Sequence, residues 1–145
     1  RCLYLLLLYK REIGNAHGAN AIGPITHCIS VDVSFALTPE LQTHQGGTLG
    51  EGPMVGHNPI LSRQMSEEME QVGLEQGITH QVKVYAGYRT GTDADGIILS
   101  GAGAQGACTC IPLRYMHTPV EVISAADMEN TAKLAAAYVA QKIRP

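Results

Sequence analysis

Apolar positions along the chain alternate between short β-type runs and stretches with helical spacing. Residues 3–9 are continuously apolar, which is typical of a fully buried strand in a parallel sheet. Residues 26–36 are rich in β-branched side chains and predict a second strand, with Asp32 in its interior. Residues 79–86 and 107–113 predict two further strands.

Helical spacing predicts three main helices between and after these strands. The first is expected to begin at Asn58-Pro59, with Asn58 as the cap and proline in the first turn, and to end at Gly77. Residues 92–100 predict a second helix, capped by Thr92. The apolar face of the first helix is predicted at Leu61, Met65, Met69 and Val72.

The last helix is expected to begin at Ser124, with Asp127 three residues on as a partial capping box. Its buried stripe is predicted at Met128, Ala132, Ala135, Val139 and Ile143. Residues 37–57 are expected to be a loop because glycines and prolines interrupt them, and a loop of this length is a candidate for function.

Strands that alternate with helices predict an α/β fold. We expect a three-layer sandwich with a mostly parallel central sheet and helices on both faces. A length of 145 residues fits one domain, and 45% apolar residues can supply its core.

The charge balance excludes some classes of partner. Ten basic against thirteen acidic residues leave a net charge of −3, which provides no basic surface for nucleic acid. The apolar run Leu3–Leu8 is shorter than the roughly 20 residues of a membrane span. Lys10-Arg11-Glu12 follows it where a signal peptide would have a small-residue cleavage site, so we expect a buried strand and no membrane association.

Four cysteines are present without the spacing of a disulfide framework. Cys108 and Cys110 lie two apart on a predicted strand and therefore share a face, where apolar neighbours favour buried thiols. A zinc ribbon would need a second cysteine pair. Reduced thiols fit an intracellular, cytoplasmic location. The glycines of residues 101–106 match a dinucleotide-binding fingerprint, but a helix precedes them and a strand follows, so a turn is expected.

Three residues of metal-ligand type lie within or just after predicted strands. Asp32 lies inside a valine-rich strand, where a metal ion or a hydrogen-bond network would have to compensate its charge. Glu12 and His117 follow strands, at the edge where open α/β sheets bind ligands. A solvated carboxylate and a hydrogen-bonded histidine are the structural alternatives. Together, two carboxylates and an imidazole suit zinc or cobalt better than magnesium.

Several stretches of the chain resemble dinuclear-metal aminopeptidases, a family that includes glutamyl and deblocking aminopeptidases, tetrahedral aminopeptidases and members described as endoglucanases. The separations of 20 residues from Glu12 to Asp32 and 85 from there to His117 also fit that family. The matching runs, in the family's order, are Glu12-Ile13-Gly14, Val31-Asp32-Val33-Ser34-Phe35-Ala36, Leu49-Gly50-Glu51-Gly52-Pro53, Gly91-Thr92-Asp93-Ala94 and residues 111–121.

The resemblance implies roles for single residues. Asp32 would bind one divalent ion, zinc or cobalt, and Glu12 and His117 would bind a second. A water molecule with a pKa lowered by the ions would attack the scissile carbonyl of a peptide substrate, with a glutamate as general base. Thr92 and Asp93 would lie near the substrate, and a helix cap is the alternative for them.

The chain departs from the family pattern at the general base. The family carries a Glu-Glu pair before Ile-Gly, whereas this chain has Arg11-Glu12-Ile13-Gly14, so Arg11 stands in the position of the base. A guanidinium cannot accept a proton. We therefore expect little or no activity from this chain alone.

The family's other histidine ligand, its bridging aspartate and its dimerisation domain come before the Glu-Glu pair. Residues 1–145 therefore resemble the C-terminal portion of one metallopeptidase catalytic domain, without the dimerisation domain and incomplete at its N-terminal side. We expect the chain to form a homo-oligomer or to associate with a companion segment. A non-catalytic pseudoenzyme or assembly subunit, and a sequence error at residue 11 in a normal enzyme, are the alternatives.

Overall fold

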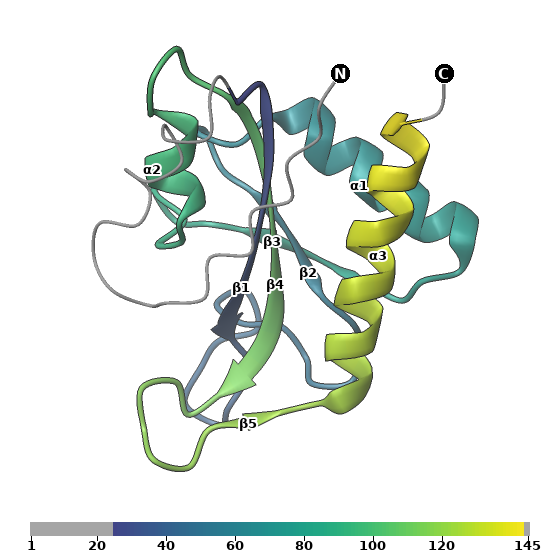
Figure 1. Ribbon diagram of the computed structural model, residues 1–145. Helices are drawn as coiled ribbons and strands as arrows, with labels where there is room; N and C mark the ends of the chain where they lie inside the picture. Colours follow the sequence, from purple (N-terminus) through teal and green to yellow (C-terminus); the bar gives the residue numbers. More distant parts are fainter. Residues whose placement is uncertain (1–24, 144–145) are drawn as a thin grey trace.

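The sheet is organised around one long strand, β4 (Gln105–Arg114), in a computed structural model that describes residues 25–143 (Figure 1). Strand β1 (His27–Phe35) runs parallel to β4 over its whole length, with Asp32 opposite Cys110. These two strands confirm the predictions for residues 26–36 and 107–113. The strand predicted at residues 3–9 lies outside the described residues.

Three shorter strands complete the five-stranded sheet of the described part, which has the order β1-β4-β2-β3. Strand β2 (Met54–His57) is antiparallel to β4, and β3 (Gln81–Val84) is parallel to β2. Strand β5 (Val122–Ile123) pairs antiparallel with the end of β4. The sheet is therefore mixed, although most of its paired residues are parallel.

Helices cover both faces of the sheet, as the α/β prediction requires. Helix α1 (Arg63–Gln76) and helix α3 (Ala125–Ile143) pack on each other and on one face, whereas the short α2 (Ala94–Ile98) lies on the opposite face (Figure 1). Within the part of the chain that the structure describes, no helix is long and apolar enough to cross a membrane.

Two apolar clusters form the core because successive residues of β4 point to opposite faces. The cluster under α1 and α3 consists of Val55, Met65, Met69, Val72, Ala107, Leu134 and Tyr138. The cluster on the face of α2 consists of Met54, Leu61, Ala94, Ile98, Cys108 and Cys110. The predicted apolar face of the first helix is thus confirmed at Met65, Met69 and Val72, whereas Leu61 precedes α1 and packs in the cluster on the face of α2. The prediction of buried thiols at Cys108 and Cys110 is confirmed.

The prediction of one loop over residues 37–57 was wrong at its end. Met54 and Val55 are almost completely buried and form β2 between β4 and β3. Four residues flanked by glycine and proline are too few to show the alternation of apolar and polar side chains that identifies a strand. The hydrogen bonds of β2 to β3 and β4 stabilise it as a strand.

The first helix begins later than predicted. Ser62, not Asn58, is its cap, and the Ser62 hydroxyl accepts a hydrogen bond from the Met65 N–H at 3.3 Å. Asn58 instead closes a local turn through its side-chain oxygen, which accepts from the Ile60 N–H at 2.9 Å. Gly77 ends the helix in a left-handed conformation, as predicted.

The predicted stripe of the last helix was displaced by one residue. Met128 is 47% exposed and Ala132 is exposed, whereas the buried face consists of Asp127, Thr131, Leu134 and Tyr138. Asp127 is buried because its carboxylate accepts hydrogen bonds from the Gly50 and Gly52 N–H groups, each at 2.8 Å. Instead of forming the predicted capping box, the Asp127 side chain therefore binds the loop before β2.

An ion pair joins the two long helices. The Glu68 carboxylate accepts hydrogen bonds from the Lys142 ammonium at 2.5 Å and from the Tyr138 hydroxyl at 3.1 Å. The hydrogen bond from Lys142 lowers the pKa of Glu68 below its ordinary value of 4.5.

We expect Glu68→Gln to lower the free energy of unfolding at neutral pH by no more than about 1 kcal/mol, because the pair is partly solvated. A carboxylate with a lowered pKa in the folded state stabilises above its unfolded-state pKa, and this contribution disappears as the pH falls through the folded-state pKa. Urea unfolding at neutral and acidic pH should show the difference only at neutral pH. Glu75→Gln, on an exposed position of the same helix, should show none at either pH.

Candidate metal and substrate site

Asp32 lies on the face of the sheet that α2 covers. It is half-buried in the middle of β1, and its Oδ1 accepts a hydrogen bond from the Val33 N–H at 2.7 Å. Its charge reaches Cys108 and Cys110 on the neighbouring strand, where it raises the pKa of each thiol as one of several contributions. A carboxylate here has partial solvent access and low-dielectric surroundings, as a metal ligand requires.

His117 lies beyond the end of β4, in the connection to β5. Its φ of 66° and the φ of 58° at Tyr115 both fall in the left-handed region, which is unusual for residues with a side chain. Two hydrogen bonds hold this turn: the His117 N–H donates to Glu121 Oε1 at 2.7 Å, and the Thr118 hydroxyl donates to the Tyr115 carbonyl at 2.6 Å. The turn presents an exposed imidazole at the edge of the sheet.

Thr92 and Asp93, the residues expected near the substrate, differ in their surroundings. The Thr92 hydroxyl accepts from the Ala94 N–H at 3.3 Å and lies 3.4 Å from the Ser30 hydroxyl of β1. Asp93 is exposed and makes no capping hydrogen bond with its side chain. The prediction of Thr92 as the cap was wrong by one residue, because Asp93 is the N-cap of α2; the Thr92 hydroxyl lies one residue earlier and contacts the strand of Asp32.

The donor types of Asp32 and His117 fit a zinc-type ion, but the described residues do not complete a site. Residues 25–143 contain no group of three His, Cys, Asp or Glu side chains able to hold a metal. Glu12 and Arg11 lie outside the described residues. The structure thus places two predicted ligands, one on β1 and one after β4, without bringing a third described ligand to them.

The sequence did not predict the contacts of Tyr85 with the thiols. Its hydroxyl lies 3.1 Å from Cys110 Sγ and 3.8 Å from Cys108 Sγ. The hydrogen bond between the thiols lowers the pKa of Cys108 and raises that of Cys110, and burial raises the pKa of Tyr85. The spacing of the cysteines was the available signal, whereas nothing in the sequence placed Tyr85 beside them.

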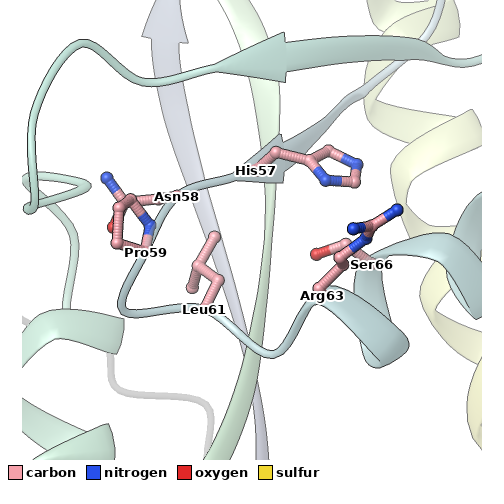
Figure 2. A pocket seen from close by; sticks show the side chains of 6 residues that line it. All are labelled: His57, Asn58, Pro59, Leu61, Arg63 and Ser66. Atoms are coloured by element: carbon pink, nitrogen blue, oxygen red, sulfur yellow. The ribbon is translucent and has the colours of Figure 1, made fainter.

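A separate open cavity of about 310 Å³ lies where β2 leads into α1 (Figure 2). His57 comes from the end of β2, and Arg63 and Ser66 come from the first turn of α1. His57 is paired with Glu70, and the Ser66 hydroxyl donates to the Gly56 carbonyl at 2.8 Å. None of the predicted site residues lines this cavity. Its lining consists of His57, Asn58, Pro59, Leu61, Arg63 and Ser66.

A comparison with known protein families identifies the family of the chain. Residues 3–134 match the model of the M42 glutamyl aminopeptidases. The chain belongs to the M42 glutamyl aminopeptidase family. The family resemblance inferred from the five sequence runs is therefore confirmed.

Known aminopeptidases and a related peptidase are similar to the chain over most of its length. A lysyl aminopeptidase of Pyrococcus furiosus is 33% identical over 99% of the chain. An aminopeptidase of the archaeon Desulfurococcus kamchatkensis is 28% identical over 88% of it, with a TM-score of 0.78. The TET1 peptidase of Pyrococcus horikoshii, which can assemble into a tetrahedron or a large octahedral shell, is 25% identical over 86%, with a TM-score of 0.63.

The M42 chain spans only part of these proteins. It covers 41% of the lysyl aminopeptidase, 37% of the Desulfurococcus protein and 36% of the TET1 peptidase. The M42 family is metal-dependent, which agrees with the ligand types of Asp32 and His117.

Proposed function

We infer that residues 1–145 form the C-terminal portion of an M42 aminopeptidase catalytic domain, whose reaction is the hydrolysis of N-terminal residues from peptides. The observation that carries this inference is Asp32: a half-buried carboxylate in the middle of β1, in a chain that matches the M42 family over residues 3–134. The proposed portion, residues 1–145, does not include a dimerisation domain.

The proposed centre holds two divalent ions, zinc or cobalt. Asp32 would hold one ion, and Glu12 and His117 would hold the other. The ions would supply a water molecule of lowered pKa as the nucleophile for the peptide carbonyl. The half-burial of Asp32 supports its role, because a partly desolvated carboxylate attracts a cation more strongly than a solvated one.

The residues of this chain would orient the substrate and the ligands. The turn over residues 115–121 fixes the backbone from which the His117 imidazole projects, through the hydrogen bond from the His117 N–H to Glu121. Thr92 and Asp93 stand at the start of α2, on the same face of the sheet as Asp32, where a bound peptide would contact them.

Arg11 makes this chain an impaired catalyst. The position before Glu12 requires a group that takes a proton from water, and a guanidinium remains protonated. The positive charge of the Arg11 guanidinium would also repel the metal ions.

The experiment that tests this proposal measures metal and activity together. The purified chain, supplied with zinc or cobalt, should release no aniline from aminoacyl-anilides above a metal-only blank. Equilibrium dialysis should show weak zinc binding that Asp32→Asn and His117→Ala each reduce further. His44→Ala, at an exposed histidine in the loop before β2, is the matched control and should not change it. Robust turnover, or two tightly held ions, would contradict the proposal.

A second candidate function is a non-catalytic subunit of an assembly. Arg11 favours it, and so do the exposed apolar side chains of β1, where Val31 is 49% and Phe35 is 48% exposed. A homo-oligomer or a companion segment would cover them.

The three cysteines of the described part are free, which supports a cytoplasmic location. The net charge of −3 argues against nucleic acid as a partner.

A further inference from the structure

Two cysteine side chains converge in the buried layer between the sheet and α2. Cys108 and Cys110, called the thiol pair below, lie on one face of β4 with their sulfur atoms 3.6 Å apart. Both residues are completely buried. The peptidase proposal uses neither of them.

The surroundings of the thiol pair hold it in place. The Tyr85 ring lies against Gly56, where an added Cβ would be only 2.9 Å from Tyr85 Cε2, so the backbone of β2 fixes the ring. The Tyr85 hydroxyl points at the pair, 3.1 Å from Cys110 Sγ. On the other side, the Thr92 hydroxyl lies 3.7 Å from Cys108 Sγ. Two hydroxyl groups therefore contact the buried thiol pair, Tyr85 at both sulfur atoms and Thr92 at Cys108.

The distance between the sulfur atoms decides what the thiol pair can hold. A disulfide needs about 2.05 Å between sulfur atoms and Cα atoms rarely more than about 6.8 Å apart, which residues two apart on a strand barely satisfy. Two thiolates on one tetrahedral zinc ion, with zinc–sulfur bonds of about 2.3 Å, stand about 3.8 Å apart, and a larger soft cation with longer bonds holds them slightly farther apart. The observed 3.6 Å is the contact of two hydrogen-bonded thiols, so a chelated cation needs only a small separation of the sulfur atoms, whereas a disulfide needs a large approach.

We propose that the thiol pair binds one soft, thiophilic divalent cation of the cadmium type. Each thiol releases its proton to solvent when its sulfur binds, so that two thiolates and one dication form a neutral unit that a buried layer tolerates. A soft cation suits two sulfur ligands. Zinc suits the site less well, because structural zinc takes four protein ligands and residues 25–143 contain no group of three His, Cys, Asp or Glu side chains able to hold a metal.

Two charged residues near the pair act on the cation in opposite directions. Asp32 stands opposite Cys110 in the register of β1 and β4 and attracts a cation. The Lys83 ammonium lies 5.5 Å from the centre of the Tyr85 ring and repels it. Lys83→Met should therefore tighten binding several-fold.

The test is a titration of the reduced chain with Cd²⁺, followed by the ultraviolet absorption of the thiolate-to-cadmium charge transfer. We expect one equivalent to bind, and Cys108→Ser and Cys110→Ser each to weaken binding at least tenfold. Cys28→Ser is the matched control, because Cys28 is a half-buried thiol on the same face of the sheet and its pKa is raised by burial to about 11. It should change the affinity less than threefold.

Alkylation of the unmodified chain covers the case in which a serine variant fails to fold. Over an incubation long enough for local opening to expose the buried thiols, Cd²⁺ should slow the alkylation of Cys108 and Cys110 by iodoacetamide, but not that of Cys28, as read by peptide mass spectrometry. Equal protection of all three, or no charge-transfer band, would overturn the proposal. The band arises only from sulfur ligands, so this test is independent of whether Asp32 and His117 hold ions.

Discussion

Replacing Arg11 with glutamate should raise aminopeptidase activity by about 10²–10⁴-fold, the usual contribution of a positioned general base. The measurement needs a complete enzyme. Residues 1–145 would therefore replace the matching segment of the Pyrococcus furiosus lysyl aminopeptidase, which covers 41% of that protein. Two chimeras, with Arg11 and with Arg11→Glu, are compared for kcat/KM on aminoacyl-anilides at saturating zinc or cobalt.

The physical reason is the protonation state of the side chain at position 11. A glutamate can hold the proton that water loses as it attacks the peptide carbonyl, whereas a guanidinium remains charged throughout. The gain should appear mainly in kcat, because proton transfer belongs to the reaction step and not to peptide binding.

Lys10→Glu in the same chimera is the matched control. It makes the same change of charge one residue earlier, so a gain through reduced repulsion of the metal ions would appear in both variants. A gain confined to Arg11→Glu identifies the general base. Equal kcat/KM for the chimeras with and without the Arg11→Glu substitution, whether high or absent, would contradict the role of Arg11 as the impairing residue.

The long strands were predictable because their own residues encode them. Strand β1 lies within the predicted residues 26–36, and β4 extends the predicted run 107–113 by a few residues. Both have β-branched or small apolar side chains over many positions. Strand β2 was missed because its stability comes from β3 and β4, which are distant in sequence.

Helix α3 shows why a hydrophobic pattern alone misplaces a buried face. Asp127 is a charged residue, so an apolar count assigns it to solvent and moves the stripe to Met128. The structure buries Asp127 because two backbone N–H groups near residue 50 need an acceptor. Such a need becomes visible only when the loop and the helix are in contact.

The candidate site was predictable to a similar extent. Asp32 and His117 were singled out as chemically unusual residues near strands, and the structure places one on β1 and the other just after β4. The left-handed turn of Tyr115 and His117 was not predictable, because it depends on the hydrogen bond to Glu121 and on the pairing of β5 with β4. Contacts between the thiol pair and Tyr85 depend likewise on the order of strands in the sheet.

Replacing Gly52 with alanine should lower the free energy of unfolding by about 4 kcal/mol, which for a chain of this size lowers the melting temperature by roughly 10–20 °C. An alanine Cβ at this position would stand 2.0 Å from the Thr79 carbonyl oxygen and 2.5 Å from its carbonyl carbon. These are backbone atoms next to β3, so they cannot turn away as a flexible side chain would. The φ of +81° adds strain for any residue with a side chain.

Gly50→Ala separates the two causes. Gly50 has a similar φ of +88°, and its N–H also donates to Asp127, but a Cβ there would meet nothing within 4 Å. Its loss should therefore be limited to backbone strain, about 1–2 kcal/mol. Thermal unfolding of the two variants side by side tests this explanation, and equal losses of unfolding free energy would show that overlap with Thr79 contributes nothing.

Because the Gly52 N–H also donates to Asp127 and the Gly52 carbonyl accepts from Gln81, displacement of Gly52 would disturb α3 and β3 together. The close approach of two backbone segments is thus the structural reason for the glycine of this M42 run.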